Sequence, residues 1–213
     1  MCGRFYTDFD DEQYREMLEL LYHESQQDAE DLMLKNGEVL PTDIVPVLEA
    51  DGPRAMQWGF TRFDGKGKII NARSETALEK GMFRTPMLSA ASAVSGKEPV
   101  GGRCLIPATG YFEWETREKK KIKYRLRPAQ EGMFTFAGLY RSEAGVKTPV
   151  FVILTAPAAE NISFIHDRMP LILPPEKRAD WLNDASAAAE LLAEGTRDMV
   201  YEPAMESSAL TLF

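Results

Sequence analysis

The second residue of the chain, Cys2, carries the most distinctive chemistry in the sequence. If Met1 is removed, as is usual before a side chain this small, Cys2 presents an α-amine and a thiol on adjacent carbon atoms. An α-amine titrates near ~7.7–8.0, so a useful fraction is neutral at cellular pH. Such a pair condenses with an aldehyde to an imine, which then closes through sulfur to a thiazolidine ring. The alternative is that Cys2 is an ordinary small apolar residue of the core.

Two other titratable residues stand in apolar surroundings. Glu113 lies between Phe112 and Trp114 in a predicted strand. Simple alternation favours exposure of Glu113 to solvent, whereas a position in a cleft would raise its pKa by desolvation. His166 is one of two histidines, and the other, His23, lies in an acidic segment where exposure is expected. His166 is therefore either the general base for Cys2 or a structural hydrogen-bonding residue.

Polar residues also interrupt two further apolar segments. Asn71 and Arg73 follow Ile70, and the arginine either holds a phosphate through two hydrogen bonds or pairs with a carboxylate such as Glu75. Thr155 ends the apolar run 150–154. Each of these motifs alone is a weak signal of function.

One segment carries cations at every second position. These residues are Lys121, Lys123, Arg125 and Arg127. In a strand this period places all four on one face. The face is either a solvated surface or a track for phosphate groups.

The elements that must position these residues are mostly strands. Aromatic and β-branched residues between Gly and Pro breaks predict strands at about 102–106, 110–115, 121–127, 133–140 and 149–155, with shorter ones near 45–48, 56–60 and 170–173. Helices are predicted from Asp10 to about Leu34, after a Ser74 cap, within 157–165, from 174 to 182 and over 185–193. Residues 89–101 are typical of a long surface loop. We therefore expect an α+β fold with a β-rich, barrel-like sheet core and peripheral helices, in a single domain 1–213 whose helical C-terminal part covers about 175–195.

Composition limits the class of protein. The chain has 213 residues, of which 44% are hydrophobic, enough to bury one substantial core. It has neither an 18-residue apolar run nor a signal-like N-terminus, so we expect a cytoplasmic protein without a membrane partner. Cys2 and Cys104 are the only cysteines, which excludes a disulfide framework and a CxxC zinc site. We expect no metal and no cofactor.

The net charge of −8 argues by itself against a nucleic-acid partner. The acidity is local, however. Residues 1–51 hold 14 acidic and 3 basic side chains, whereas residues 52–213 hold 19 acidic and 22 basic ones. The overall charge therefore leaves binding to DNA open.

Taken together and in order, the motifs resemble those of the SOS-response-associated peptidase family. The matching segments are 1–5, 58–60, 70–76, 103–108, 110–114, 151–155 and 165–170. Several separate motifs in the same order are a specific signal. The resemblance implies a compact β-rich fold with a positively charged groove, in a protein that crosslinks covalently to abasic sites in single-stranded DNA.

The resemblance also implies four catalytic residues. Cys2, exposed when Met1 is removed by the protein itself or by an aminopeptidase, would be the nucleophile that forms a thiazolidine with the ring-opened sugar. Asn71 would hydrogen-bond near its amine, and Glu113 would act as the acid/base in ring opening and imine formation. His166 would protonate or deprotonate the sugar oxygen and assist reversal. The implied activity is that of a lyase-like DNA–protein crosslinking enzyme, with cysteine-type self-peptidase activity.

Six DNA-contacting residues are implied in the same way: Gly3, Arg4, Trp58, Phe60, Arg73 and Thr155. The family places bulky side chains from the loop after Trp58 against the bases as a wedge, a role that falls here to Phe60 or Phe63. The expected partner is single-stranded DNA that contains abasic sites. The resemblance is consistent with a monomer in the cytoplasm, associated with the nucleoid when bound to DNA.

Two other classes of protein compete with this interpretation. Met-Cys-Gly also begins glutaminase domains, in which the cysteine attacks an amide, so an N-terminal-nucleophile cysteine hydrolase, either a glutaminase or a peptidase, is the alternative. The other segments of glutaminases are missing. A noncovalent nucleic-acid-binding module is the third interpretation. Residues 202–206 also depart from the pattern that the family has near its C-terminus.

Overall fold

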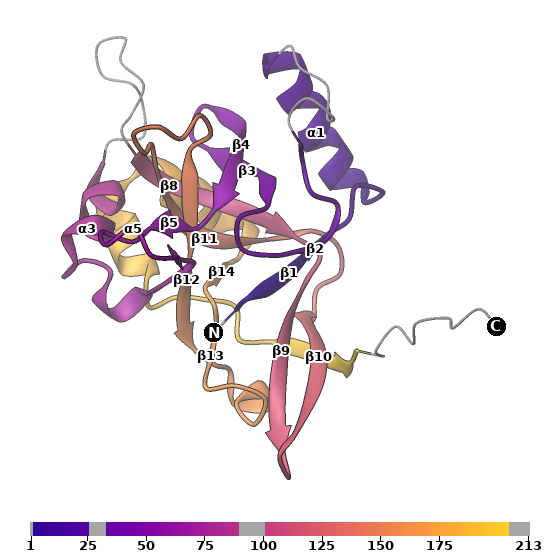
Figure 1. Cartoon of the computed structure of the whole chain (residues 1–213). Coiled ribbons are helices and arrows are strands. Elements are labelled where there is room, and N and C mark those ends of the chain that lie inside the picture. Colours follow the sequence, from indigo (N-terminus) through magenta and orange to yellow (C-terminus); the bar gives the residue numbers. More distant parts are fainter. Residues whose placement is uncertain (1, 26–32, 90–100, 205–213) are drawn as a thin grey trace.

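A ring of hydrogen-bonded strands forms the centre of the computed structural model, which describes residues 2–25, 33–89 and 101–204 (Figure 1). The ring runs through β12 (Val150–Pro157), β4 (Gly52–Trp58), β3 (Ile44–Glu49), β8 (Gly101–Ala108) and β11 (Phe134–Arg141), which pairs with β12 again. Three short strands extend it: β7 (Asn71–Arg73), β13 (Arg168–Pro170) and β14 (Ile172–Leu173). The predicted α+β fold with a barrel-like core is confirmed.

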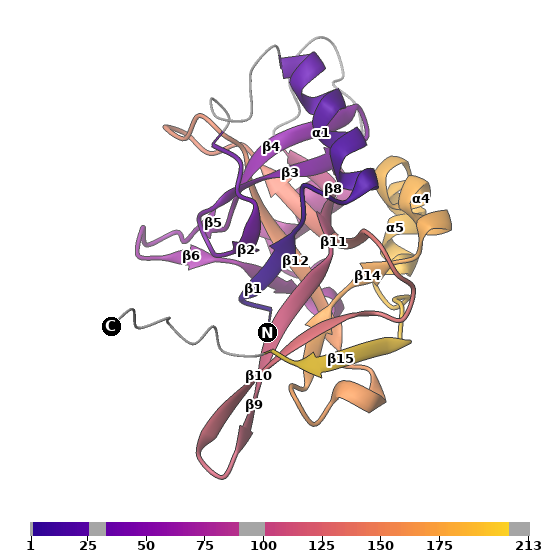
Figure 2. The ribbon, with the colours of Figure 1, turned by 90° about the vertical axis from the view of Figure 1, so that its right-hand side faces the viewer.

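A second sheet of five strands packs against this ring (Figure 2). Its order is β15 (Met199–Pro203), β10 (Lys120–Pro128), β9 (Gly110–Arg117), β1 (Arg4–Thr7) and β2 (Gly37–Val39). A two-stranded ribbon, β5 (Phe60–Thr61) with β6 (Lys68–Ile69), lies beside the ring. Side chains such as Phe5, Tyr111 and Phe136 fill the space between the sheet and the ring.

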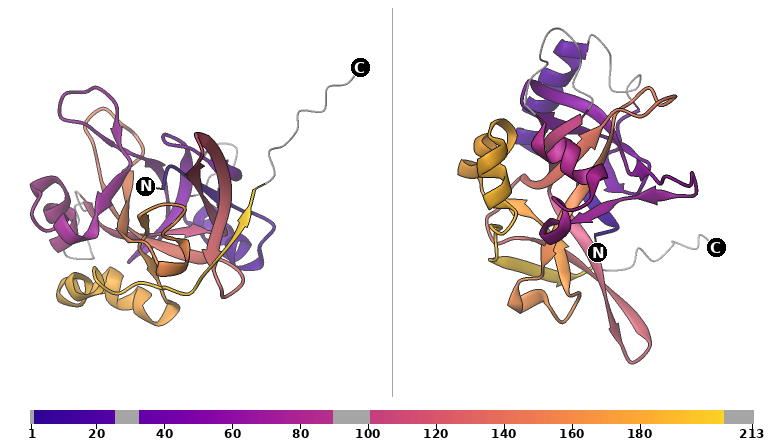
Figure 3. Two further views of the ribbon diagram at one scale, coloured as in Figure 1. Left: turned by 90° about the horizontal axis from the view of Figure 1, so that it is seen from below. Right: turned by 90° about the vertical axis from the view of Figure 1, so that its left-hand side faces the viewer.

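Helices cover the opposite side of the ring. They are α3 (Gly81–Leu88), α4 (Arg178–Asn183) and α5 (Ala185–Leu191) (Figure 3). The 3-10 turn η4 (Pro175–Lys177) leads directly into α4, and the other two 3-10 turns are η1 (Ser74–Thr76) and η3 (Glu160–Ile162). Helix α1 (Glu12–Ser25) buries a separate stripe of Tyr14, Met17 and Leu18. Strand β12 is buried on both faces, since Phe151 and Ile153 enter one core cluster while Val152 and Leu154 enter the other.

The five long strands lie where the sequence predicts them, but several helix predictions are wrong. Of the helix expected over 10–34, α1 covers Glu12–Ser25, residues 26–32 lie outside the described residues, and Leu34 forms a bridge with Ile44. Ser74 is the first residue of a 3-10 turn, whose N-cap is Arg73 without a side-chain cap. Within 157–165 only Glu160–Ile162 is helical. Residues 90–100 of the predicted loop lie outside the described residues, and Gly101 already belongs to β8.

Among the described residues, the structure contains no helix that combines the length and the apolar character needed to span a membrane.

One buried arginine ties the helices to the ring. Arg103, on β8, is only 4% exposed, and its guanidinium donates hydrogen bonds to four backbone carbonyls at the C-terminal ends of two helices. The acceptors are Met87 O at 2.7 Å and Ser89 O at 2.9 Å near the end of α3, and Trp181 O at 2.6 Å and Leu182 O at 3.0 Å in α4. A cation at a helix C-terminus satisfies carbonyls that have no partner within the helix and opposes the helix dipole.

We predict that Arg103→Met lowers the free energy of unfolding by about 3 kcal/mol, because it leaves four carbonyls without their buried donor. Urea denaturation of the full chain measures this loss. The matched control is Arg84→Met, which changes an exposed arginine on α3. If the two variants were equally stable, the four hydrogen bonds of Arg103 would contribute nothing net.

Candidate functional site

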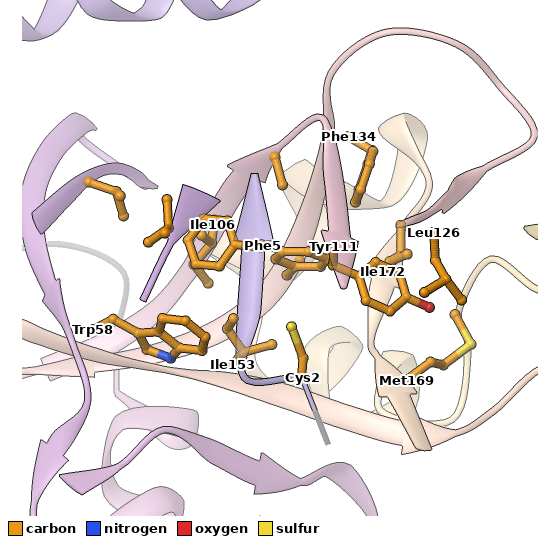
Figure 4. Close-up of a cluster of buried hydrophobic side chains, with 14 of the residues drawn as sticks. Cys2, Phe5, Trp58, Ile106, Tyr111, Leu126, Phe134, Ile153, Met169 and Ile172 are labelled. Carbon is orange, nitrogen blue, oxygen red and sulfur yellow. The ribbon is translucent and has the colours of Figure 1, made fainter. Parts of the chain in front are cut away.

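Cys2 is fully buried at the entry to β1. Its thiol lies 3.5 Å from the carbonyl oxygen of Arg4, and its side chain points into the core cluster that contains Tyr111, Ile153 and Met169 (Figure 4). Burial, followed by the charge of Glu113, raises the pKa of the Cys2 thiol well above its usual range. The sulfur is therefore held as a neutral thiol at physiological pH.

Asn71 holds the backbone of Cys2. Its Nδ2 donates a hydrogen bond of 2.7 Å to the Cys2 carbonyl. Asn71 begins β7, which pairs in parallel with β12, and the preceding carbonyl of Ile70 accepts a 2.9 Å hydrogen bond from the indole nitrogen of Trp58. Within the described residues the buried Oδ1 of Asn71 has no hydrogen-bond donor, so it remains available to accept one.

Glu113 faces inward, contrary to the exposure that alternation favoured. It is 4% exposed, while its neighbours on β9, Phe112 and Trp114, occupy the outer face of the sheet. The alternation is real, but the sheet packs its odd-numbered β9 positions against the ring, and this places the carboxyl in the interior. Burial raises the pKa of Glu113, and the positive charge of nearby His166 opposes this shift.

His166 lies in the turn before β13, and its imidazole is half-buried. Its Nδ1 is 3.0 Å from the backbone nitrogen of Arg168 and 2.8 Å from Oδ1 of Asp167. In the neutral ring Nδ1 accepts the Arg168 N–H, which leaves the proton on Nε2. When the ring gains a second proton, Nδ1–H donates to Asp167 instead, so both protonation states of His166 have a partner.

Tyr111 is a member of this site that the sequence did not single out. It lies two positions before Glu113 on the same face of β9. Burial raises its pKa well above the usual range, and the charges of Cys2 and Glu113 add to that shift, so the three groups are close together. Its buried hydroxyl has no hydrogen-bond partner within the described part of the chain. The period-two spacing from Glu113 is the signal that would have found it.

The two arginines among the implied DNA contacts are accessible. Arg4 is on β1 and points to the outer face of the sheet, where its guanidinium forms a 2.7 Å ion pair with Glu38. Arg73 ends β7 and is exposed. Gly3, between Cys2 and β1, is half-buried.

Three other implied contacts are buried. Trp58, Phe60 and Thr155 are each 0% exposed, so in this structure their side chains support neighbouring segments and present no surface to a ligand. The exposed aromatic residue of the loop after Trp58 is Phe63, at 98%.

Arg168, two residues after His166, holds Glu75 and the backbone of Thr155 in place. Arg168 donates through Nη2 to the carbonyl of Thr155 at 2.5 Å and to Oε2 of Glu75 at 2.8 Å, while its Nη1 also bonds Glu75. Hydrogen bonding to Arg168 lowers the pKa of Glu75 to about 2. Glu75 thus pairs with Arg168.

The arrangement combines a held N-terminal cysteine, a carboxyl with a raised pKa and an imidazole with a partner in either protonation state. These are the components of proton transfer around one nucleophilic centre. No group of three or more His, Cys, Asp or Glu side chains within the described ranges is placed to hold a metal ion.

The chain is similar to known proteins in both sequence and fold. The chain is 32% identical over 212 residues to Abasic site processing protein YoqW of Bacillus subtilis, covering 90% of this chain and 84% of that protein. It is 31% identical over 206 residues to Abasic site processing protein YedK of Escherichia coli, covering 92% and 86% of the two chains. A crystal structure of a protein from Bacteroides thetaiotaomicron superposes with a TM-score of 0.75 at 24% identity, covering 96% of this chain and 93% of that chain.

The family model described as SOS response associated peptidase (SRAP) matches residues 1–209. That match spans the ring, the five-stranded sheet and every element that carries the site. The chain therefore belongs to the SOS response associated peptidase family.

Proposed function

We propose that this protein processes abasic sites in single-stranded DNA by capturing them covalently through Cys2. Relatives about a third identical over most of the chain are named abasic site processing proteins. The observation that carries the proposal is the hydrogen bond from Asn71 to the Cys2 carbonyl, which holds the N-terminal residue beside Glu113. A residue so close to a chain end is usually mobile, and fixing it in place lowers the entropic cost of reaction.

The chemistry requires that Met1 is first removed, by the protein itself or by an aminopeptidase, so that Cys2 gains a free amine. The amine adds to the aldehyde carbon of the ring-opened sugar and gives a carbinolamine. Loss of the hydroxyl as water forms the imine. The thiol then adds to the imine carbon, its proton passes to the nitrogen, and a thiazolidine results with the net release of one water molecule.

Glu113 suits the proton transfers of this sequence. Its raised pKa keeps a larger fraction of the carboxyl protonated near neutral pH than is usual for glutamate. The acid form protonates the departing hydroxyl of the carbinolamine, and the carboxylate accepts a proton from the amine. Because the thiol is neutral, the amine reacts first and the sulfur traps the imine afterwards.

His166 acts on the sugar oxygen. The protonated His166 ring gives its Nε2 proton to the ring oxygen as the closed hemiacetal opens, and in the neutral ring that remains Nδ1 accepts the Arg168 backbone N–H. In the reverse direction Nε2 takes the proton back from the sugar hydroxyl as the ring closes, and Asp167 pairs with the imidazolium that forms. We assign Arg4 and Arg73 to phosphates and the exposed Phe63 to the wedge between bases.

The hydrolase alternative receives less support. A cysteine that attacks an amide needs a thiolate, or a base that forms one, and burial shifts the pKa of Cys2 in the opposite direction. Covalent capture by an amine has no such need.

We predict that Cys2→Ser captures abasic single-stranded DNA only as an imine. Its adduct survives denaturing electrophoresis when borohydride is added and disappears without it, because a hydroxyl is a poor trap for an imine. The wild-type adduct survives without reductant. A chain with Met1 retained, checked by intact mass, should form neither, and a stable adduct from that chain would exclude the proposed linkage.

We predict that Glu113→Gln slows adduct formation about 100-fold, the usual contribution of a general acid/base. The wild-type rate should fall as pH rises through the elevated pKa of Glu113, since the acid form is lost, and the variant should lack this fall. The control is Glu115→Gln, on the same face of β9, whose carboxylate binds Arg117 at 2.8 Å and Tyr124 at 2.9 Å. Equal rates for both variants would remove Glu113 from the mechanism.

We predict that His166→Ala slows release of the adduct more than it slows capture, because closure of the sugar ring on release requires the imidazole as the base that accepts the proton of the sugar hydroxyl. Transfer from a labelled oligonucleotide to excess unlabelled abasic DNA measures release. His23→Ala, on the exposed side of α1, serves as the control. A variant that captures slowly but releases at the wild-type rate would contradict the assignment.

A further inference from the structure

The outer face of the five-stranded sheet is the feature that the mechanism leaves unused, apart from Arg4 at its edge on β1. The predicted alternation of cations holds in β10: Lys121 is exposed, and Lys123, Arg125 and Arg127 are half-buried on the face opposite Tyr124 and Leu126. The tip of the β9–β10 ribbon extends beyond the rest of the domain (Figure 2).

Strand register aligns the row with aromatic residues of the neighbouring strands. Lys123 lies opposite Trp114, and Arg125 lies opposite Phe112. The Nζ of Lys123 is 3.9 Å from the centroid of the Phe112 ring, and the guanidinium of Arg4 is 5.3 Å from that of Trp114. Cations alternating with rings are the composition of surfaces that bind single strands through phosphates and bases.

Arg125 is positioned rather than free to move. Its guanidinium carbon is 5.2 Å from the Tyr6 ring centroid, and it crosses β9 at Gly110, where an added Cβ would meet Arg125 Nε at 2.9 Å. That buried nitrogen has no hydrogen-bond partner among the described residues. Between Arg125 and Arg127 the surface has a hollow of about 160 Å³, also lined by Val200, Tyr201 and Glu202.

Two acids face the same surface and oppose an anionic ligand. Glu38 binds Arg4 at 2.7 Å and Lys123 at 2.8 Å, and Glu202 lies opposite Arg125 in the register. Five cations against two carboxylates leave the face positive, whereas the whole chain has a net charge of −8. Glu38 pairs with Arg4 and Lys123, which are two of the cations that a phosphate would bind.

We propose that this outer face is a second nucleic-acid surface, which binds the phosphate backbone of a single strand outside the reactive centre. The binding is noncovalent and independent of sequence. It goes beyond the capture of abasic sites at Cys2, because its β10 cations lie on the face of the sheet opposite Tyr111 and Glu113, and only Arg4 is shared with the proposed contacts of the captured strand.

The test measures binding of an undamaged oligothymidylate to the full chain. Lys121→Ala/Arg125→Ala/Arg127→Ala should weaken the Kd about tenfold at low salt and reduce the slope of log Kd against log salt by about 2, since each single-strand phosphate contact contributes about 0.7. Lys80→Ala/Arg84→Ala/Lys147→Ala removes the same charge from exposed positions elsewhere and should bind like wild type. Equal losses in both triple variants would overturn the proposal.

Glu38→Gln should change the Kd for oligothymidylate in the opposite direction. It frees Arg4 and Lys123 while keeping the shape of the side chain, so the Kd should tighten several-fold, a gain that damage to the fold would not produce. Unchanged or weaker binding by this variant would count against the surface.

Intrinsic fluorescence locates the contact. Of the three tryptophans, Trp58 and Trp181 are 0% exposed and Trp114 is partly exposed, so a quench on adding oligothymidylate reports on Trp114. An equal quench by polyglutamate would assign the face to acidic polypeptides instead. The same measurements on Cys2→Ala should match wild type, so failure of covalent capture and failure of this surface are separate results.

Discussion

The amide of Asn71 holds the carbonyl of Cys2, and the rest of the site depends on this contact. Chain ends are ordinarily the least ordered part of a domain. Here Asn71 belongs to β7, which pairs with β12 of the ring, so the N-terminal residue is fixed to the central element of the fold and not only to its own strand. Trp58 supports the same segment by donating to the carbonyl of Ile70.

Burial determines both how Cys2 is held and the protonation state of its thiol. The environment that excludes water from Cys2 raises the pKa of its thiol, and the same desolvation raises the pKa of Glu113. The two shifts have opposite chemical effects: the sulfur becomes a weaker nucleophile at neutral pH, and the carboxyl becomes a better proton donor. An amine that attacks first and a thiol that closes the ring later fit this pair of shifts, whereas direct attack by a thiolate does not.

The sequence predicted the positions of the long strands better than it predicted which of their side chains face the core. Strands β8 to β12 were found because alternation and Gly or Pro breaks are local signals. Alternation separates Glu113 from Phe112 and Trp114, yet only the packing of the sheet on the ring decides which set is buried, and that packing is nonlocal. The same limit explains Trp58 and Phe60, whose motif does not indicate that the core covers them. Strand β15 was missed because its residues are mostly exposed and it forms by pairing with β10.

The period of two also lets one strand serve two purposes. On β9 the odd positions Tyr111 and Glu113 face Cys2, and the even positions Phe112 and Trp114 face outward under Arg4 and Lys123. Because these sets do not share a face, the outer one is free of the requirement for burial that governs the chemistry. The largest cause of the raised pKa of Glu113 is burial, which is a property of the inner face. A nucleic-acid strand bound at the outer face would therefore leave unchanged the burial that raises the pKa values of Cys2 and Glu113.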